Sequence, residues 1–213
     1  MQQSVVAPKE AFTLLKELAS AKFDESVEVH VRLTIDARKG DQQVRSTVTL
    51  PHGTGKDVRV AVITSTQQEA ATEAGATVVG GEEIIEEIAK GEVIGNVDII
   101  IATPEMMPKL ASVARILGPR GMMPNPKAGT VTQDVAKTVA DVRTGQVDFR
   151  NDRTGNIHQV IGKASFTPEQ LEENYTALLS AIEAARPQGY KGALIARVTV
   201  CTTMSPSVTT LMK

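Results

Sequence analysis

The sequence predicts a mixed α/β and α+β protein of two domains, and three patterns along the chain lead to this prediction. Residues 27–35 alternate apolar and polar side chains, as in a strand with one buried face. Residues 58–117 instead alternate short apolar runs with helical patterns, which is typical of a parallel sheet covered on both faces. After residue 145 the alternating pattern returns. We therefore expect a discontinuous α+β sandwich domain made of both chain ends, residues 1–53 plus 144–213, and an inserted three-layer Rossmann-like α/β domain, residues 54–143. Two chain crossings would form the hinge between them.

The first part of the chain predicts one helix and two strands. Pro8 and Glu10 suit the first turn of a helix, which we expect to end near Phe23. The alternating strand over 27–35 follows, and a second strand over 44–50 is expected to be its antiparallel neighbour.

The inserted part predicts three apolar strands with helices between them. The strands are expected at 58–63, 77–79 and 97–102, and the helices at 67–74, 82–90, 104–117 and 134–142. Residues 119–129 contain three Pro and two Gly, so we expect no regular structure there.

The last part of the chain predicts a hairpin, a helix and a strand. The hairpin joins strands at 147–150 and 157–166 through a turn at 151–156, and the helix runs from Thr167 to about Ala185. The final strand covers 193–202, and its alternation predicts that one face carries Leu194, Ala196, Val198 and Val200.

Composition excludes several classes of protein and conceals an uneven distribution of charge. A single cysteine, Cys201, rules out an intramolecular disulfide, and no apolar run approaches the 18 residues of a membrane helix. The net charge of −2 argues against a general nucleic-acid binder. However, residues 69–92 hold seven acids and one Lys, whereas 106–133 and 184–213 hold no acid at all. Two local positive regions therefore lie within a neutral sum.

Motifs for catalysis, metal binding or cofactor binding are not evident. His30, His52 and His158 lie in different segments without metal-ligand spacing, so we expect polar strand or turn roles, no metal and no cofactor. The sequence Gly-Thr-Gly-Lys at 53–56 lacks the remaining residues of a phosphate loop.

The loop from 118 to 129 is suited to nucleic-acid contact. It displays Arg120, Asn125 and Lys127, a combination that can bind phosphate and ribose groups. A rigid connector between domains is the structural alternative. A small-molecule-binding α/β enzyme, using the inserted domain and this loop, remains the functional alternative.

Five blocks of sequence resemble one known family in the same order. The longest, residues 118–131, reads GPRGMMPNPKAGTV, and the others lie at 21–29, 50–53, 149–155 and 202–204. Together they resemble the family of large-ribosomal-subunit protein number one, the L-one stalk proteins, of bacterial or organellar type. The match spans nearly the whole chain.

The resemblance implies a structural constituent of the large ribosomal subunit and not an enzyme. It implies binding of large-subunit rRNA at the mobile stalk near the tRNA exit site, where the protein assists release of deacylated tRNA. Other ribosomal components are implied as neighbours, and translational repression through its own operon mRNA is implied for bacterial-type systems. The expected location is the large subunit of the ribosome, in a bacterial cytoplasm or inside a mitochondrion or chloroplast. Neither a membrane nor an obligate homo-oligomer is expected.

The resemblance also implies which residues bind rRNA, mainly on the discontinuous domain. Cationic side chains would meet phosphates, carboxylates would accept hydrogen bonds from ribose hydroxyls or base amino groups, and apolar ones would cover exposed sugars or bases. The set comprises Lys22, Phe23, Ser26, Glu28, Arg32, Asp152, Arg153, Thr203, Met204 and Ser205, with Arg120, Asn125 and Lys127 as a secondary RNA-contact loop. Ser26, Glu28 and Arg32 share the outward face of the alternating strand.

Two residues depart from the family pattern. Ser205 stands where the family usually has Gly, so its Cβ is expected to crowd an approaching RNA backbone or to require a less permissive φ. Arg197 occupies a position that is often small and polar.

Overall fold

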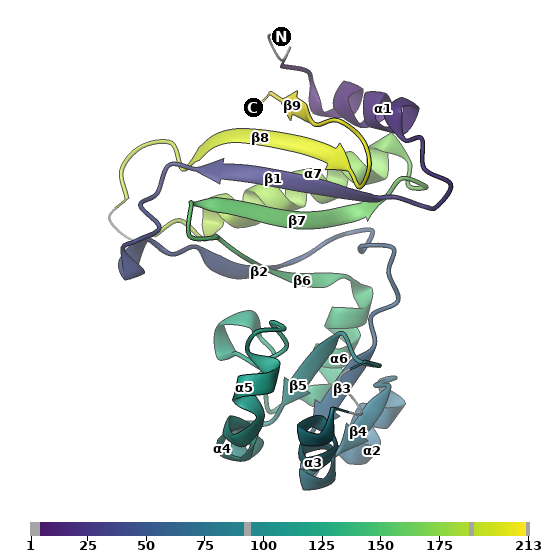
Figure 1. Ribbon diagram of the computed structural model, residues 1–213, viewed down its shortest axis with the longest axis vertical. Helices are drawn as coiled ribbons and strands as arrows, with labels where there is room; N and C mark the ends of the chain where they lie inside the picture. The colour runs from purple at the N-terminus through teal and green to yellow at the C-terminus, as the bar shows by residue number, and fades with distance from the viewer. Residues whose placement is uncertain (1–4, 92–94, 188–189, 212–213) are drawn as a thin grey trace. The chain divides into compact units, whose positions relative to one another are not determined.

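The computed structural model describes residues 5–91, 95–187 and 190–211, which form two compact units (Figure 1). The first unit comprises Met1–Gly55 and Gly145–Lys213, and the second comprises Lys56–Thr144. Within the described ranges, no helix is long and apolar enough to cross a membrane.

The first unit is built around a four-stranded antiparallel sheet in which β1 is an inner strand. The order is β7-β1-β8-β9, with β1 at Ser26–Leu33, β7 at Asn156–Lys163, β8 at Ile195–Thr202 and β9 at Val208–Thr210. Val27, Val29, Val31 and Leu33 are buried, whereas the alternate residues of β1 are not, as the sequence pattern predicts. One face of β1 therefore packs and the other is available for contact.

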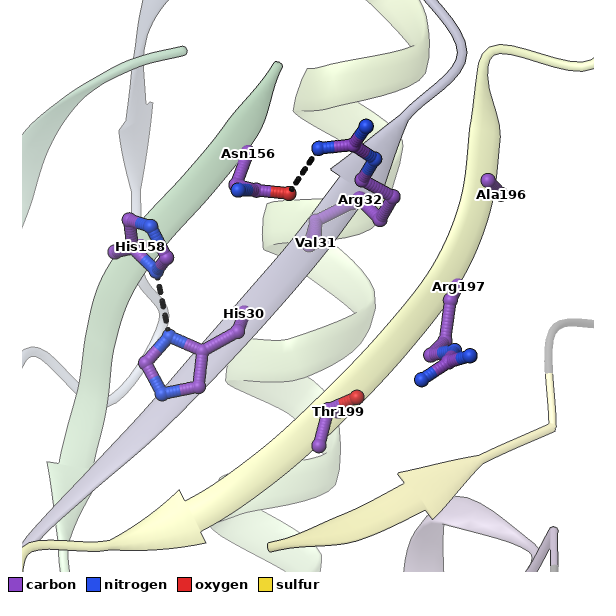
Figure 2. A pocket seen from close by; sticks show the side chains of 8 residues that line it. All are labelled: His30, Val31, Arg32, Asn156, His158, Ala196, Arg197 and Thr199. Carbon is purple, nitrogen blue, oxygen red and sulfur yellow. Dashed lines mark hydrogen bonds between the residues drawn. The ribbon is translucent and has the colours of Figure 1, made fainter. Parts of the chain in front are cut away.

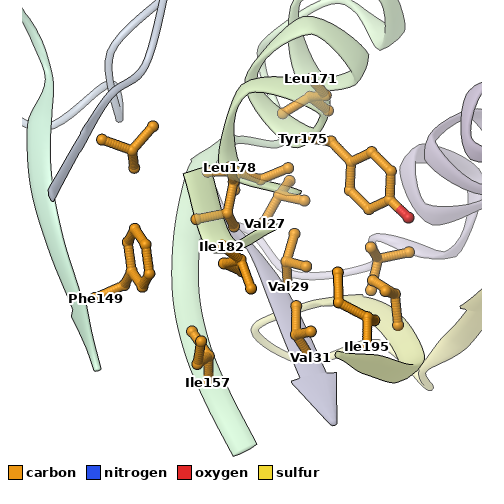
Figure 3. Packing of buried hydrophobic residues seen from close by; sticks show 14 of the residues in the cluster. Val27, Val29, Val31, Phe149, Ile157, Leu171, Tyr175, Leu178, Ile182 and Ile195 are labelled. Carbon is orange, nitrogen blue, oxygen red and sulfur yellow. The ribbon is translucent and has the colours of Figure 1, made fainter. Parts of the chain in front are cut away.

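Two helices and a second, two-stranded sheet complete the core of this unit. The helices are α1 (Pro8–Leu18) and α7 (Pro168–Ala184), the strands are β2 (Arg45–Thr49) and β6 (Gln146–Arg150), and a 3₁₀ turn, η1, covers Gly40–Gln42. Figure 3 shows Val29 of β1 facing Leu178 and Ile182 of α7, and Phe149 on the separate strand β6; all four belong to one buried cluster. The side chain of Thr167 caps α7 by accepting a hydrogen bond from the backbone N–H of Gln170.

The predicted strand pairings in this unit are wrong in two places. The strand expected at 44–50 pairs with β6 and not with β1, because both edges of β1 are occupied by β7 and β8. Strands β6 and β7 do not form the expected hairpin either: they belong to different sheets, and only an isolated bridge between Asn151 and Ile157 connects them in the described part of the chain.

Three further boundaries differ from the expectation. Helix α1 ends at Leu18 instead of near Phe23, because Ala19 is extended with φ −66° and ψ 107°. In β8 the register shifts opposite Arg32 and Leu33, so Ala196 is exposed and Ile195 takes its expected place in the core. The short strand β9 was not expected.

The second unit contains a three-stranded parallel sheet with helices on both faces. Its order is β4-β3-β5, with β3 at Val60–Ile63, β4 at Val78–Gly80 and β5 at Ile99–Ala102. One face packs against α2 (Gln68–Glu73) and α6 (Val135–Thr144), and the other against α3 (Glu82–Lys90), α4 (Met107–Leu110) and α5 (Ala114–Leu117). Successive residues of β3 alternate between the two faces, which explains its unbroken apolar run.

The helix expected over 104–117 is broken into short pieces. The 3₁₀ turns η2 (Pro104–Met106) and η3 (Ala111–Val113) alternate there with α4 and α5. Pro108 has no N–H to offer the carbonyl of Pro104, so one continuous helix cannot form. Residues 119–129 are irregular apart from one 3₁₀ turn, η4, at Pro126–Ala128.

Asn174 of α7 is a fully buried polar side chain that joins three segments of the first unit. Its Nδ2 donates hydrogen bonds to the carbonyls of Gly53 at 2.9 Å and Ile161 at 2.7 Å. Its Oδ1 accepts from the backbone N–H of His52 at 3.0 Å. The helix thus satisfies backbone groups at the point where the chain leaves the first unit.

Replacing Asn174 by Leu is expected to lower the free energy of unfolding by roughly 2–4 kcal/mol, because buried backbone groups lose their hydrogen-bond partners although the side chain keeps its branching at Cγ. Urea denaturation followed by circular dichroism measures this. Thr176→Ala, on the exposed side of α7, is the control and should change the free energy by less than about 0.5 kcal/mol. An Asn174→Leu variant as stable as the parent would contradict this role.

Candidate nucleic-acid interface

The structure distributes the ten residues implied for rRNA contact between the two ends of β1. The β1-start group comprises Lys22, Phe23, Ser26, Glu28, Thr203, Met204 and Ser205, and the β1-end group comprises Arg32, Asp152 and Arg153. The rise of a strand separates Ser26 from Arg32 by about 20 Å. Both groups belong to the first unit.

A buried carboxylate outside the implied set, Glu25, holds the β1-start group together. Glu25 is 1% exposed, and its Oε1 accepts a hydrogen bond from the backbone N–H of Ala21 at 3.0 Å. Its Oε2 accepts from the Thr202 hydroxyl at 2.6 Å and from the backbone N–H of Met204 at 2.9 Å. The segment before β1 and the turn after β8 are therefore tied to the same side chain.

These hydrogen bonds favour the ionised form of Glu25. The Thr202 hydroxyl and the Met204 N–H lower the pKa of this carboxyl, outweighing burial, which acts in the opposite direction. Glu25 is thus a charged structural group and not a free contact for a ligand.

The turn that follows β8 is fixed by its own hydroxyls. Thr203 Oγ1 accepts from the backbone N–H of Ser26 at 3.1 Å, which joins the turn to the first residue of β1. Ser205 Oγ accepts from the N–H of Thr202 at 3.0 Å and donates to the Pro206 carbonyl at 3.1 Å. Among the described residues, no residue other than glycine has a positive φ. Ser205 therefore sits in an ordinary conformation and does not require the less permissive φ that was expected.

Apolar side chains and a cation form the exposed part of the β1-start group. Met204 is 67% exposed and Phe23 is 57% exposed, the two largest values among the large apolar side chains of the described ranges. Lys22 is exposed beside Phe23. Lys163, which is not among the residues that the resemblance implies, donates to Ser26 Oγ at 2.9 Å.

The β1-end group is a structured turn with one free cation. Arg32 donates to Asn156 Oδ1 at 3.1 Å and to the Thr154 carbonyl, so it joins β1 to the turn before β7. Arg153 is exposed, and in the described part of the chain no hydrogen bond or ion pair engages its side chain. Arg153 is therefore the member that can meet a phosphate without losing an internal partner.

Asp152 is used within the same turn. Its carboxylate accepts from the backbone N–H groups of Thr154 and Asn156, at 2.8 Å each, and from the Thr154 hydroxyl. Burial opposes ionisation, but these hydrogen bonds outweigh it and hold the pKa of Asp152 far below its usual range. Asp152 shapes the turn that presents Arg153.

A hollow on the outward face of the sheet adjoins the β1-end group (Figure 2). It is lined by His30, Val31, Arg32, Asn156, His158, Ala196, Arg197 and Thr199. Arg32 and Arg197 are register partners on β1 and β8, so two guanidinium groups border the hollow. An anionic ligand is the kind of group that this lining favours.

The secondary loop lies in the second unit, where Asn125 has a local structural role. Its Oδ1 accepts from the backbone N–H of Lys127 at 2.8 Å and caps η4, while its own N–H donates to Thr130 Oγ1 at 2.8 Å. Arg120 and Lys127 are exposed. The loop therefore presents two cations on a locally fixed backbone.

One signal in the sequence could have identified Glu25. Position 25 is in phase with the buried odd-numbered residues that begin at Val27, so continuing the alternation backwards places Glu25 inside. No comparable signal exists for Lys163, because strand pairing alone brings it to Ser26.

Comparisons with known proteins decide the family. A model described as the Ribosomal protein L1p/L10e family matches residues 15–206. The chain belongs to this family.

Relatives in bacteria agree with this assignment. The protein named large ribosomal subunit protein uL1 in Mesoplasma florum is 50% identical to this chain over 207 residues, which cover 97% of this chain and 91% of the relative. The protein of the same name in Deinococcus radiodurans is 55% identical over 201 residues, which cover 93% of this chain and 85% of the relative. The one in a Synechococcus strain is 51% identical over 209 residues, which cover 98% of this chain and 88% of the relative. The family is structural, which confirms that the protein is not an enzyme.

Replacing Glu25 by Gln is expected to lower Tm by roughly 3–8 °C, because an amide presents donors to groups that themselves donate. The native pKa is lowered, so the stabilisation exists above the ordinary value of 4.5 and is lost as pH falls through the native pKa. The difference in Tm between the parent and Glu25→Gln should therefore become smaller as the pH is lowered.

Thermal melts at several pH values between neutrality and strong acid test this expectation. Glu17→Gln, on the exposed face of α1, serves as the control and should melt like the parent. An unchanged Tm for Glu25→Gln would contradict the role of Glu25, as would a difference in Tm from the parent that grows as the pH falls.

Proposed function

We propose that the protein binds large-subunit rRNA directly through the β1-start group, the hollow and the β1-end group. As a member of the L1p/L10e family it is a structural component of the large ribosomal subunit, with rRNA and other ribosomal components as its partners. The resemblance of its sequence blocks to the stalk proteins supports a location at the mobile stalk beside the tRNA exit site.

The observation that carries this proposal is the position of Met204 and Phe23. Both apolar side chains are exposed to solvent, and they lie on segments that are fixed by hydrogen bonds to the Glu25 carboxylate. Exposed apolar side chains on a fixed backbone have no stabilising role in the free protein, whereas they can cover ribose or stack on unpaired bases. A buried hydrogen-bond network that orients them is the construction expected of a binding surface.

Charge places a second constraint on how RNA is recognised. The chain has a net charge of −2, so nonspecific attraction to phosphate is weak. Arg153, Arg197 and Lys22 provide separated phosphate contacts. Discrimination would then come from shape and from a few matched contacts.

The finer roles rest on the resemblance. We extend the proposal to assisted release of deacylated tRNA at the exit site and to repression through the leader of its own operon mRNA, which would present the same RNA shape. Arg120, Asn125 and Lys127 would supply a secondary RNA contact. The expected location is the ribosome of a bacterial cytoplasm or of an organelle interior; the relatives named above are bacterial.

Met204→Asp is expected to weaken binding to a stalk rRNA fragment by at least tenfold, because it places a charge against RNA and removes apolar contact. Filter binding with unrelated competitor RNA measures the affinity. Leu14→Asp, which alters a 40% exposed apolar residue of α1, is the matched control and should leave affinity unchanged. Equal affinities for Met204→Asp and the parent would remove the turn from the interface.

Arg153→Ala is expected to reduce the slope of log K against log salt by roughly one unit, because one phosphate contact is lost. The same titration at several salt concentrations provides the slope. Lys137→Ala removes one exposed charge from the second unit and should leave the slope as it is. A slope that is unaffected by Arg153→Ala would exclude this residue from phosphate contact.

A further inference from the structure

Three side chains with metal-binding atoms meet on the outward face of the sheet. Glu28 and His30 share that face of β1, and Cys201 of β8 is the register partner of Glu28. His30 Nε2 lies 3.2 Å from Cys201 Sγ and 3.8 Å from Glu28 Oε2. One donor atom from each residue falls within 4.8 Å of the others. Ligand atoms around a tetrahedral zinc ion lie about 3.3–3.8 Å apart, so small side-chain movements suffice.

A neighbouring histidine orients the central ligand. His158 Nδ1 lies 2.8 Å from His30 Nδ1, and His158 Nε2 lies 3.6 Å from Asp152 Oδ2 (Figure 2 shows the histidine pair). The Asp152 carboxylate favours a proton on His158 Nε2, so His158 Nδ1 is the acceptor and His30 Nδ1 the donor. The lone pair of His30 Nε2 then faces the thiol and the carboxylate. An outer hydrogen bond that fixes the ligating tautomer is a usual feature of histidine metal sites.

We propose that Glu28, His30 and Cys201 form a binding site for a divalent transition-metal ion, with zinc the best match. One thiolate, one imidazole and one carboxylate are ligands that zinc accepts, and a water molecule would complete four-coordination. The sequence spacing predicted no metal site, because residues 28 and 30 gain their third ligand only through pairing with β8. The site does not depend on RNA binding.

Metal binding at this site requires Cys201 to lose its proton. Burial lowers the pKa of His30, the charge of its neighbour His158 lowers it further, and Glu28 opposes the shift. Burial and the Glu28 charge raise the pKa of the Cys201 thiol. Binding therefore breaks the Cys201 S–H bond: the proton goes to solvent, the sulfur keeps the electron pair and bonds to the metal, and nothing is oxidised.

An ion can reach these groups from solvent. The side chains of His30 and Glu28 are 30% and 37% exposed, and Cys201 is half-buried. The ligands are thus accessible while their backbone is held by an inner strand and its neighbour.

The test is a titration of the reduced full-length chain, without RNA, with Co²⁺ as a spectroscopic probe for the zinc site. We expect one Co²⁺ per chain, a near-ultraviolet sulfur-to-cobalt charge-transfer band, release of a proton and displacement of Co²⁺ by Zn²⁺. Cys201→Ser should abolish the band, and His30→Gln should weaken binding at least tenfold. His52→Gln is the matched control: His52 pairs with Glu173 at 2.6 Å in the same unit, and binding should not change.

Three results would overturn the proposal: no charge-transfer band at saturating Co²⁺, a band that persists in Cys201→Ser, or equal weakening by His52→Gln and His30→Gln. Far-ultraviolet circular dichroism and the melting temperature establish that each variant is folded. Because the titration contains no RNA, a negative result leaves the rRNA proposal intact, and failure of rRNA binding leaves this result intact.

Discussion

The arrangement of the interface depends on one buried carboxylate. A charged side chain withdrawn from water is tolerated only when hydrogen bonds replace its hydration, and Glu25 obtains them from Ala21, Thr202 and Met204. These donors come from opposite ends of the chain. The hydrogen bonds to Glu25 therefore hold the segment before β1 against the turn after β8. They also fix the backbone that carries the exposed side chains Phe23 and Met204.

A division of labour follows among the residues implied for RNA contact. Asp152, Thr203 and Ser205 use their polar atoms within the protein, so they build the turns. Met204 and Arg153 project from those turns with their surfaces free in the described ranges. A rigid surface with few contacts suits recognition of a shaped RNA, because little conformational freedom is lost on binding.

Local periodicity made much of the fold predictable from sequence. Helix α3 has the expected bounds, and the alternation over β1 gives its buried face correctly, because both depend on neighbours close in the chain. The pairing of β2 with β6 and the exposure of Ala196 depend on which distant strands occupy the edges of β1 and on a register shift. The burial of Glu25 was not predicted, because a carboxylate is expected to be exposed unless its hydrogen-bond donors are known. No spacing along the chain indicates that Thr202 is such a donor. The proximity of Cys201 to His30 has the same long-range origin.

The place of β1 in the sheet also constrains how the molecule is made. Strand β1 ends at Leu33, but its neighbours begin only at Asn156 and Ile195, whereas the second unit is one continuous stretch, Lys56–Thr144. During synthesis from the N-terminus, all residues of the second unit are therefore available before β7 and β8 are made. Until then both edges of β1 remain unpaired. During that interval β1, with one apolar face and both edges exposed, can pair with the wrong strand, so the order of synthesis makes the first unit more prone to misfolding than the second.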